Sequence, residues 1–222
     1  MLLLAVDTSG RSGTLALADI DGEAVTLVEE VGLAGATFSA QLVPQTAALL
    51  EKHGYSKADL AGFAVISGPG SFTGLRVGLA AIKALAEILC KPIAAVSLLE
   101  AMARSGTGEG RVFSLLDAGR GDYYIGDYGL GPPVHRHSER LLSPEEFSAA
   151  DKAQRVVTAD VRLAEAVRAA GFRVEQIDYP RSRDIARIGW ERIQRGETVL
   201  PEDLDANYLR RTDAEIFSKP KL

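Results

Sequence analysis

Several residue types that carry chemistry are scarce in this sequence. Of its 222 residues, one is cysteine, three are histidine and one is tryptophan. The single cysteine, Cys90, excludes an internal disulfide, and its place at the apolar end of a predicted helix indicates packing and not reactivity. His135 and His137 lie two residues apart without a third ligand, and His53 is expected to complement a helix dipole. We therefore expect no metal site.

Long hydrophobic runs are absent as well. The apolar opening, residues 2–6, is cut off by Asp7 and has no basic region before it, so it predicts a buried strand and not a signal peptide. We expect a cytoplasmic protein without a membrane partner. The 46% of hydrophobic residues is enough for one large domain or two compact lobes.

Positive charge is also limited. The chain has 25 Lys and Arg against 30 Asp and Glu, a net charge of −5, which argues against a free-standing nucleic-acid binder. The local exceptions are Arg181, Arg183, Arg187, Arg192, Arg195 and the pair Arg210 and Arg211. Because Asp184 and Glu191 interrupt them, solvated helix faces are the favoured interpretation and a minor RNA contact is the alternative.

The most informative segment is Ile66 to Glu87, which joins an apolar strand, residues 63–66, to a long helix through Gly68-Pro69-Gly70. Ser71 or Thr73 can cap the helix. One broad face carries Leu75, Leu79, Ile82, Leu85 and Leu89. Gly74, Gly78 and Ala81 form a flat strip beside it, which we expect to let a second helix come close.

Known phosphate and nucleophile motifs do not fit this segment. A P-loop needs a lysine after its last glycine, but Leu75 follows Gly74, and G-x-G-x-x-G fails because Thr73 takes the place of the third glycine. The stretch Gly70 to Gly74 also has the wrong spacing for the G-x-S-x-G elbow of hydrolases. A plain strand-to-helix connection remains the simplest interpretation.

A strand ending in aspartate, followed by a tight turn and a returning strand, occurs twice. Residues 2–7 end at Asp7 and return over residues 14–18, and residues 112–116 lead to Asp117 and return over residues 123–128. Two such units suggest a duplicated βββαβα lobe, although two hairpins can also be similar by chance. Asp7 and Asp117 can cap their turns through hydrogen bonds from the side chain to the backbone.

Further elements follow from periodicity and capping. A helix is expected from Phe38 to His53, with Thr37 as N-cap and with Pro44 kinking it or shifting its start. Other helices are expected at 98–105, 144–150, 162–170 and 185–195, and short strands at 94–97, 156–158 and 174–177. Residues 105–110 are the clearest linker.

The segment Gly68 to Gly78 resembles the GPGSFTGLR-[IV]-G signature of the TsaB (YeaZ) family. The resemblance extends to Met1–Ser9, to Leu116–Asp122 and to Asn207–Arg210, so it covers nearly the full length. It implies an α/β, actin-like (ribonuclease H-like, ASKHA) fold with two lobes. We expect residues 1–104 and 105–222 to form them, with a tail, 205–222, that could pack back on the first lobe.

The resemblance also implies a function. TsaB-like proteins are non-catalytic subunits that pair with the catalytic paralogue TsaD and help recruit the ATPase TsaE, in the modification that makes threonylcarbamoyladenosine in tRNA. We expect no cofactor, a homodimer when the chain is isolated, and tRNA contact only through the complex. The rival functions are an active small ATPase or kinase of the same superfamily and, third, a glycopeptidase-like hydrolase.

Two sets of site residues follow. A vestigial phosphate site would comprise Asp7, Thr8, Ser9, Asp117 and Gly119. The expected partner interface comprises Phe38, Leu42, Val43, Thr46, Leu49, Leu50, Ser71, Phe72, Thr73, Gly74, Leu75, Arg76, Gly78, Leu79 and Ile82. Several family members have histidine where this chain has Thr37-Phe38-Ser39, which removes one polar group from the start of the first interface helix.

Overall fold

The computed structural model describes residues 1–34 and 37–210, which form two compact units. Unit 1 comprises Met1–Ala101 and Tyr179–Ala206, and unit 2 comprises Met102–Asp178 together with residues 207–210. Of the expected tail, 205–222, residues 211–222 lie outside the described residues. None of the described helices is both long and apolar enough to cross a membrane.

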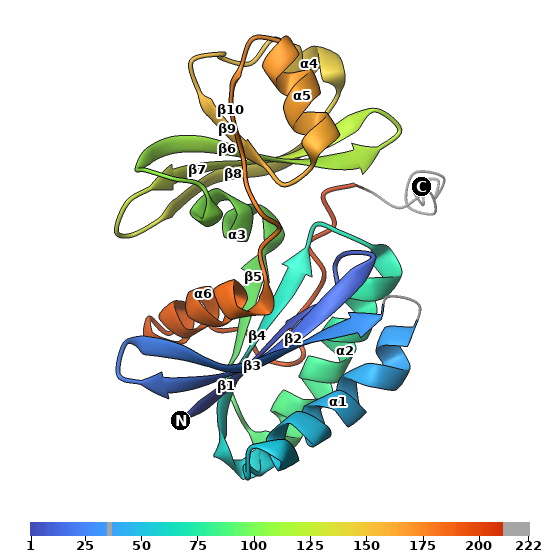
Figure 1. Cartoon of the computed structure of the whole chain (residues 1–222), viewed down its shortest axis with the longest axis vertical. Coiled ribbons are helices and arrows are strands. Elements are labelled where there is room, and N and C mark those ends of the chain that lie inside the picture. The colour runs from blue at the N-terminus through green and yellow to red at the C-terminus, as the bar shows by residue number, and fades with distance from the viewer. Residues whose placement is uncertain (35–36, 211–222) are drawn as a thin grey trace, which may run out of the picture. The chain divides into compact units, whose positions relative to one another are not determined.

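Unit 1 is built on a five-stranded sheet in the order β3-β2-β1-β4-β5 (Figure 1). An antiparallel meander, β1 (Leu2–Asp7), β2 (Ser12–Asp21) and β3 (Ala24–Ala34), is followed by β4 (Leu60–Gly68) and β5 (Ile93–Ser97), which run parallel to β1. All six residues of β1 are buried, because this central strand is covered on both faces. The continuous apolar run at the start of the sequence therefore predicts this strand correctly.

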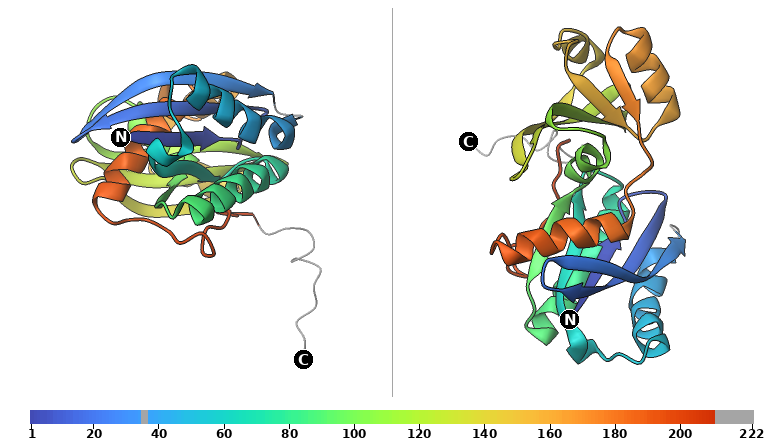
Figure 2. Two further views of the ribbon diagram at one scale, coloured as in Figure 1. Left: turned by 90° about the horizontal axis from the view of Figure 1, so that it is seen from below. Right: turned by 60° about the vertical axis from the view of Figure 1, so that its left-hand side comes forward.

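Helices cover both faces of that sheet (Figures 1 and 2). On one face lie α1 (Phe38–Lys52) and α2 (Phe72–Leu89), and on the other lies α6 (Ser182–Gln194). A short 3-10 helix, η2 (Lys57–Asp59), precedes β4, and α3 (Leu98–Ser105) follows β5. The crossovers through α1 and α2 are what allow β4 and β5 to lie parallel to β1.

Unit 2 repeats this plan. Its sheet has the order β10-β9-β6-β7-β8, in which β6 (Gly110–Gly119), β7 (Asp122–Leu130) and β8 (His135–Leu142) form the meander, and β9 (Arg155–Thr158) and β10 (Arg173–Gln176) run parallel to β6. The helices α4 (Pro144–Ser148) and α5 (Val161–Ala169) connect the later strands. Phe147 and Phe172 stack in the core of this unit, with ring centroids 4.6 Å apart.

Because both units share one strand order, the duplication expected from the two aspartate-ended hairpins is confirmed. The architecture is that of the actin-like, ribonuclease H-like fold. The expected ranges of eight elements differ from the structure by no more than three residues at either end: α1, α3, α4, α5, α6, β5, β9 and β10.

One helix does not belong to the lobe that its position in the sequence suggests. The helix α6 follows unit 2 along the chain but packs on the sheet of unit 1. A Cβ on its Gly189 would collide with Ala64 of β4, and Trp190 Nε1 donates to the carbonyl of Gly22 at 2.9 Å. The absence of a side chain at position 189 is what lets the helix lie so close to the strand.

Three local expectations need correction. Thr37 precedes α1, but its side chain makes no capping hydrogen bond, and instead its hydroxyl donates to the Ala34 carbonyl. Of the two alternatives for Pro44, the structure excludes the shifted start, because Pro44 is exposed inside a helix that begins at Phe38, and the kink stays a prediction. Cys90 is exposed and not packed, because it forms the C-cap of α2 in the left-handed conformation, with φ of 52°.

Candidate functional site

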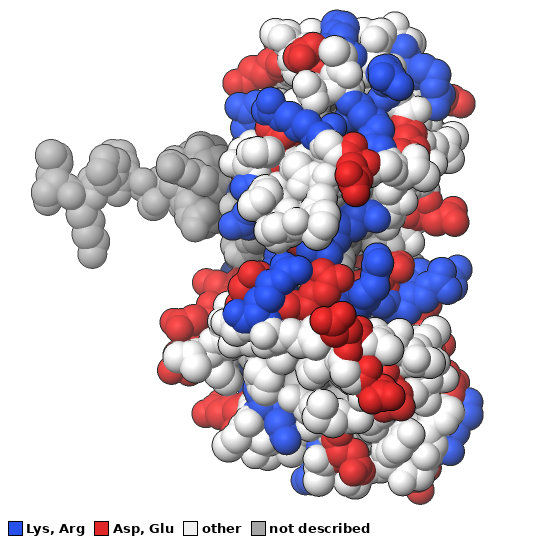
Figure 3. Space-filling view, turned by 90° about the vertical axis from the view of Figure 1, so that its left-hand side faces the viewer, with Lys and Arg blue, Asp and Glu red and all other residues white. Residues whose placement is uncertain are grey.

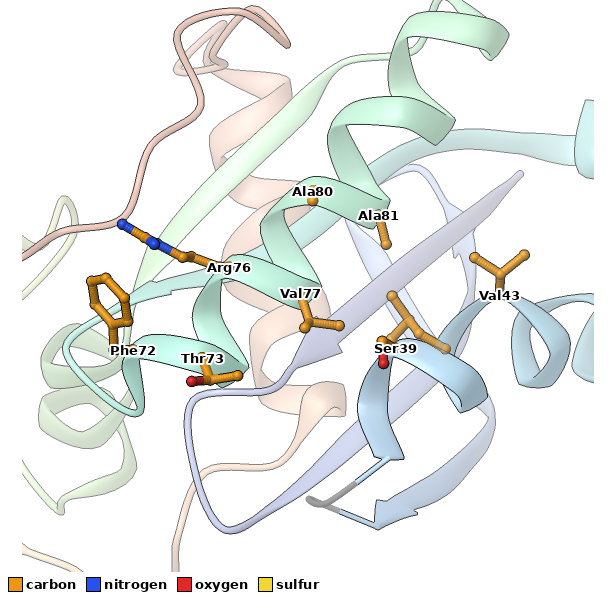
Figure 4. A pocket seen from close by; sticks show the side chains of 9 residues that line it. Ser39, Val43, Phe72, Thr73, Arg76, Val77, Ala80 and Ala81 are labelled. Carbon is orange, nitrogen blue, oxygen red and sulfur yellow. The ribbon is translucent and has the colours of Figure 1, made fainter.

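A groove lies between α1 and α2 on the surface of unit 1 (Figure 4). It has a volume of about 470 Å³ and is lined by Ser39, Leu42 and Val43 of α1 and by Phe72, Thr73, Arg76, Val77, Ala80 and Ala81 of α2. Val43 is 53% exposed and Phe72 is 40% exposed. The groove is therefore an open, mostly apolar surface with one cationic side chain in its lining.

That cation and the aromatic ring lie at one end of the groove (Figure 4). The guanidinium carbon of Arg76 is 3.7 Å from the centroid of the Phe72 ring, in cation–π contact. Both side chains come from the first two turns of α2, whose start is defined by Ser71: its hydroxyl accepts from the Gly74 N–H at 3.3 Å. The N-cap expected from the sequence is thus confirmed at Ser71, and the capped helix presents Phe72 and Arg76 outward.

The structure divides the expected interface residues into two groups. The exposed residues are Val43, Ser71, Phe72, Thr73 and Arg76. The buried residues are Phe38, Leu42, Thr46, Leu49, Leu50, Gly74, Leu75, Gly78, Leu79 and Ile82. Of the buried group only Leu42 also lines the groove. The remaining buried side chains pack inside unit 1, which makes them unavailable to a partner.

Sequence reasoning missed three residues of the groove, Ser39, Val77 and Ala80, whereas Ala81 was expected in the small strip of α2 that a second helix could approach. Their spacing carried a usable signal, since Thr73, Val77 and Ala80 follow one another at helical intervals on a face of α2 without large apolar side chains. In an amphipathic helix such a face is the one left for solvent or for a partner.

The glycine strip on α2 faces inward, contrary to expectation. A Cβ on Gly74 would overlap the carbonyl oxygen of Thr8, and a Cβ on Gly78 would overlap the Thr8 hydroxyl. The small residues do permit a close approach, but the neighbour is the turn after β1 in the same unit and not a partner helix. The placement of Gly74 and Gly78 in the interface is therefore wrong.

That turn holds three of the expected phosphate-site residues. Asp7, Thr8 and Ser9 are each no more than 3% exposed. Asp7 Oδ1 accepts from the Ser9 N–H at 2.8 Å and from the Ser9 hydroxyl at 2.6 Å. Burial raises the pKa of the Asp7 carboxyl, and the two hydrogen bonds from Ser9 offset this only in part. The turn-capping interpretation accounts for this geometry.

Tyr179 extends the same cluster. Its hydroxyl lies 3.1 Å from the Ser9 hydroxyl, in hydrogen-bonding distance. Partial burial and the nearby Asp7 carboxylate raise the pKa of Tyr179, since both disfavour the phenolate. The hydroxyl is thus a neutral hydrogen-bonding group at physiological pH.

In unit 2 the corresponding aspartate, Asp117, also caps its own turn. Asp117 Oδ1 accepts from the Gly119 N–H at 2.7 Å, so it caps its own turn, but unlike Asp7 it is exposed. The vestigial phosphate site stays a prediction. Each of its two aspartates is described within its own unit, and each has a local structural role.

The histidines and arginines have their own local contacts. His53 caps α1, and its Nε2 lies 2.7 Å from Glu29 of β3, while His135 and His137 are exposed on β8. Within residues 1–34 and 37–210, no three His, Cys, Asp or Glu side chains are grouped so that they could hold a metal ion.

Acidic groups partner many of the arginines singled out in the sequence. The pairs are Arg181 with Glu30, Arg192 with Glu100, Arg195 with Glu191 and Arg210 with Asp122. Arg211 lies outside the described residues. On the face shown in Figure 3 basic and acidic side chains are interleaved. Arg192 does not belong to a solvated face, because its partner Glu100 is buried.

Comparison with known proteins places this geometry in a family. A family model described as TsaD, tRNA N6-adenosine threonylcarbamoyltransferase, matches residues 32–132. The tRNA threonylcarbamoyladenosine biosynthesis protein TsaB of Bacillus subtilis is 36% identical over 129 residues, which span 58% of this chain and 55% of that protein. The TsaB of Escherichia coli is 28% identical over 96% of both chains.

A solved structure agrees with the sequence relatives. The structure described as YeaZ from Pseudomonas aeruginosa matches 94% of this chain and 99% of its own, with a TM-score of 0.75 and 26% identity. The residues matched by the family model, 32–132, include the segment Gly68–Gly78 on which the resemblance rests. The chain is therefore similar, over nearly its whole length, to proteins of the TsaB/YeaZ family.

Proposed function

We propose that this protein is a non-catalytic subunit of the machinery that makes threonylcarbamoyladenosine in tRNA. It acts by docking onto the catalytic paralogue TsaD through the groove between α1 and α2. The observation that carries the proposal is this groove, because it exposes Val43 and Phe72 beside small side chains that let a partner approach closely.

The family comparison supports the choice of partner. The residues matched by the TsaD model, 32–132, include both α1 and α2. A paralogue with the same fold has its own equivalents of these two helices. Two such helix pairs can meet about a pseudo-two-fold axis, each filling the other's groove. In the absence of TsaD a second copy of this chain takes that place, so the isolated protein is a homodimer.

The turn beneath the groove supports a scaffold and not a catalyst. The Asp7 carboxylate accepts hydrogen bonds from Ser9, and the Thr8 hydroxyl donates to the Gly74 carbonyl at 2.7 Å. These polar atoms, which lie where nucleotide-binding relatives of this fold would use them, hold the chain's own backbone. TsaE and tRNA then join through the assembled complex, and the acidic net charge of −5 suits a subunit that does not hold tRNA alone.

A matched pair of substitutions tests the docking surface. Val43→Asp places a charge in the groove, whereas Val161→Asp places the same charge on a valine of nearly equal exposure, 52%, at the start of α5. We expect Val43→Asp to abolish TsaD binding in calorimetry and threonylcarbamoyl transfer in a reconstituted reaction, and Val161→Asp to change neither. Normal binding by Val43→Asp would exclude the groove as the docking surface.

ATP turnover distinguishes the proposal from its rival. The isolated chain is expected to hydrolyse no ATP and to transfer no threonylcarbamoyl group. Sustained turnover that is lost in Asp7→Asn or Asp117→Asn would instead identify an active ATPase or kinase of the actin-like superfamily. Peptide or glycopeptide hydrolysis by the isolated chain would favour the third alternative.

A further inference from the structure

The groove and the turn after β1 lie on different sides of the first two turns of α2. Thr8, only 1% exposed, donates its hydroxyl to the Gly74 carbonyl at 2.7 Å, across 66 residues of sequence. The Ser71 N–H, at the N-cap, donates to the Ser9 carbonyl at 2.7 Å. The start of α2 is therefore held by two hydrogen bonds to residues 8 and 9.

Three glycines make this contact possible. A Cβ on Gly70 would lie 2.6 Å from both the Cβ and the carbonyl oxygen of Ser9, and a Cβ on Gly74 or Gly78 would overlap Thr8. Gly74 and Gly78 lie four residues apart on one side of α2, and Gly70 lies just before its N-cap, Ser71. We call Thr8, Ser9 and these three glycines the α2 seat.

One residue of the α2 seat, Gly74, also contacts the start of α1. Phe38, the first residue of α1, is 4% exposed. Its ring packs on two glycines, since a Cβ on Gly13 would lie 2.9 Å from Phe38 Cε1 and a Cβ on Gly74 would lie 3.4 Å from Phe38 Cε2. The start of α1 is thus placed against Gly13 of β2 and against Gly74, which belongs to the α2 seat.

We propose that Thr8 is a positioning residue for the docking surface: its hydroxyl sets how deeply α2 lies on β1, and with it the width of the groove that a partner enters. This inference rests on the proposed function, because it assigns Thr8 a role in docking. Thr8 itself is buried and touches no partner. Its effect on affinity passes through α2.

The chemistry of the contact predicts which substitutions matter. In Thr8→Val a methyl group replaces the hydroxyl, so the donor to Gly74 is lost and a larger group faces Gly78. The helix must move outward. In Thr8→Ser the donor remains and only a methyl group is removed, so α2 keeps its place. Thr46→Val is the matched control, because Thr46 is 5% exposed and its hydroxyl donates to the Leu42 carbonyl within α1.

Two measurements on the full-length chain test the inference. The first is amide hydrogen exchange of residues 72–80 in the isolated protein, with α6 as internal reference. The second is affinity for TsaD, measured at a temperature where every variant is folded. We expect Thr8→Val to exchange roughly fivefold faster at 72–80 and to bind roughly fivefold more weakly, the factor of one net hydrogen bond. Thr8→Ser and Thr46→Val should stay near the wild type.

The outcomes separate this inference from the proposed function. Unchanged exchange at residues 72–80 in Thr8→Val would overturn the positioning role. Faster exchange in Thr8→Val with unchanged affinity for TsaD would also overturn the positioning role. If Val43→Asp still abolishes binding in that case, the docking surface itself is retained. Weaker binding by Thr46→Val as well as Thr8→Val would also overturn the positioning role, since any buried hydroxyl would then suffice. If Val43→Asp binds TsaD normally, the docking surface fails and the inference fails with it.

Discussion

The hydroxyl of Thr8 occupies the space that a side chain on Gly78 would need. Gly78 is buried in the middle of α2. Because it has no side chain, the helix can lie close to the turn after β1. This contact decides which face of α2 is internal. It leaves Phe72, Arg76 and Val77 to line the groove.

Gly78→Ala should therefore destabilise the protein, although alanine favours helix by about 1 kcal/mol over glycine. The added methyl group overlaps Thr8, and overpacking of this kind costs about 1–3 kcal/mol. For a chain of this size each kcal/mol lowers Tm by about 2–4 °C. Gly78→Leu should be worse and should prevent folding.

The control for Gly78→Ala is Gly32→Ala in β3, where an added Cβ meets no atom within 4 Å. We expect this variant to melt within a degree or two of the wild type (~0.5 kcal/mol or less). A Gly78→Ala protein as stable as Gly32→Ala in thermal denaturation would show that the Thr8 contact is not tight in solution.

Self-association should depend on the groove. The isolated protein is expected to sediment as a dimer at micromolar concentration. Ala80→Glu places a carboxylate in the groove and should give a monomer, because a buried unpaired charge opposes association. Ala84→Glu, one turn further along the exposed surface of the same helix and outside the groove, should remain dimeric. Dimers in both variants would place self-association on another surface.

Stability should depend on pH through Asp7. Because its pKa is raised in the fold, the folded state binds more protons than the unfolded state between the two pKa values, and stability falls as pH rises through the folded pKa. Asp7→Asn keeps the acceptor for Ser9 but cannot ionise. We expect its Tm to exceed that of the wild type at pH 7, with the difference closing as pH falls below the ordinary value of 3.8.

The contribution of Asp59 to stability depends on pH with the opposite sign to that of Asp7. The Ser56 N–H and hydroxyl lower the pKa of this exposed carboxyl, so its contribution to stability is present above the unfolded pKa and is lost in acid. Asp59→Asn should melt below the wild type at pH 7 and approach it in acid. If Asp7→Asn followed the same direction as Asp59→Asn, the Asp7 carboxylate would be stabilising and the burial argument would be wrong.

The buried ion pair that ties α6 to unit 1 should matter more than an exposed one. Arg192 pairs with Glu100, which is 5% exposed, and also donates to the carbonyl of Ala95. Arg192→Met leaves the Glu100 carboxylate buried without this partner and should cost about 3 kcal/mol in urea denaturation. Arg195→Met removes the exposed pair with Glu191 and should cost about 1 kcal/mol or less. Equal costs would contradict this ranking.

Local sequence patterns determined most of the elements. The apolar run of β1, the glycine and proline break after β4, the N-cap at Ser71 and the aspartate-ended turns all depend on neighbours a few residues away, so they can be recognised without the fold. The strands that had no predicted range, β3 and β8, are sheet edges. Both strands are partly exposed, and β8 is mostly polar, so neither has the fully buried apolar run of a central strand such as β1.

What the small face of α2 contacts could be learned only from the folded chain. Helical periodicity in the sequence is enough to bring Gly74 and Gly78 together on one side of a helix that can be approached closely. Periodicity does not distinguish a partner's backbone from the chain's own, and the neighbour proved to be Thr8, more than 60 residues away. For the same reason α6, amphipathic in sequence, was assigned to unit 1 only by the side chains and glycine that pack it there.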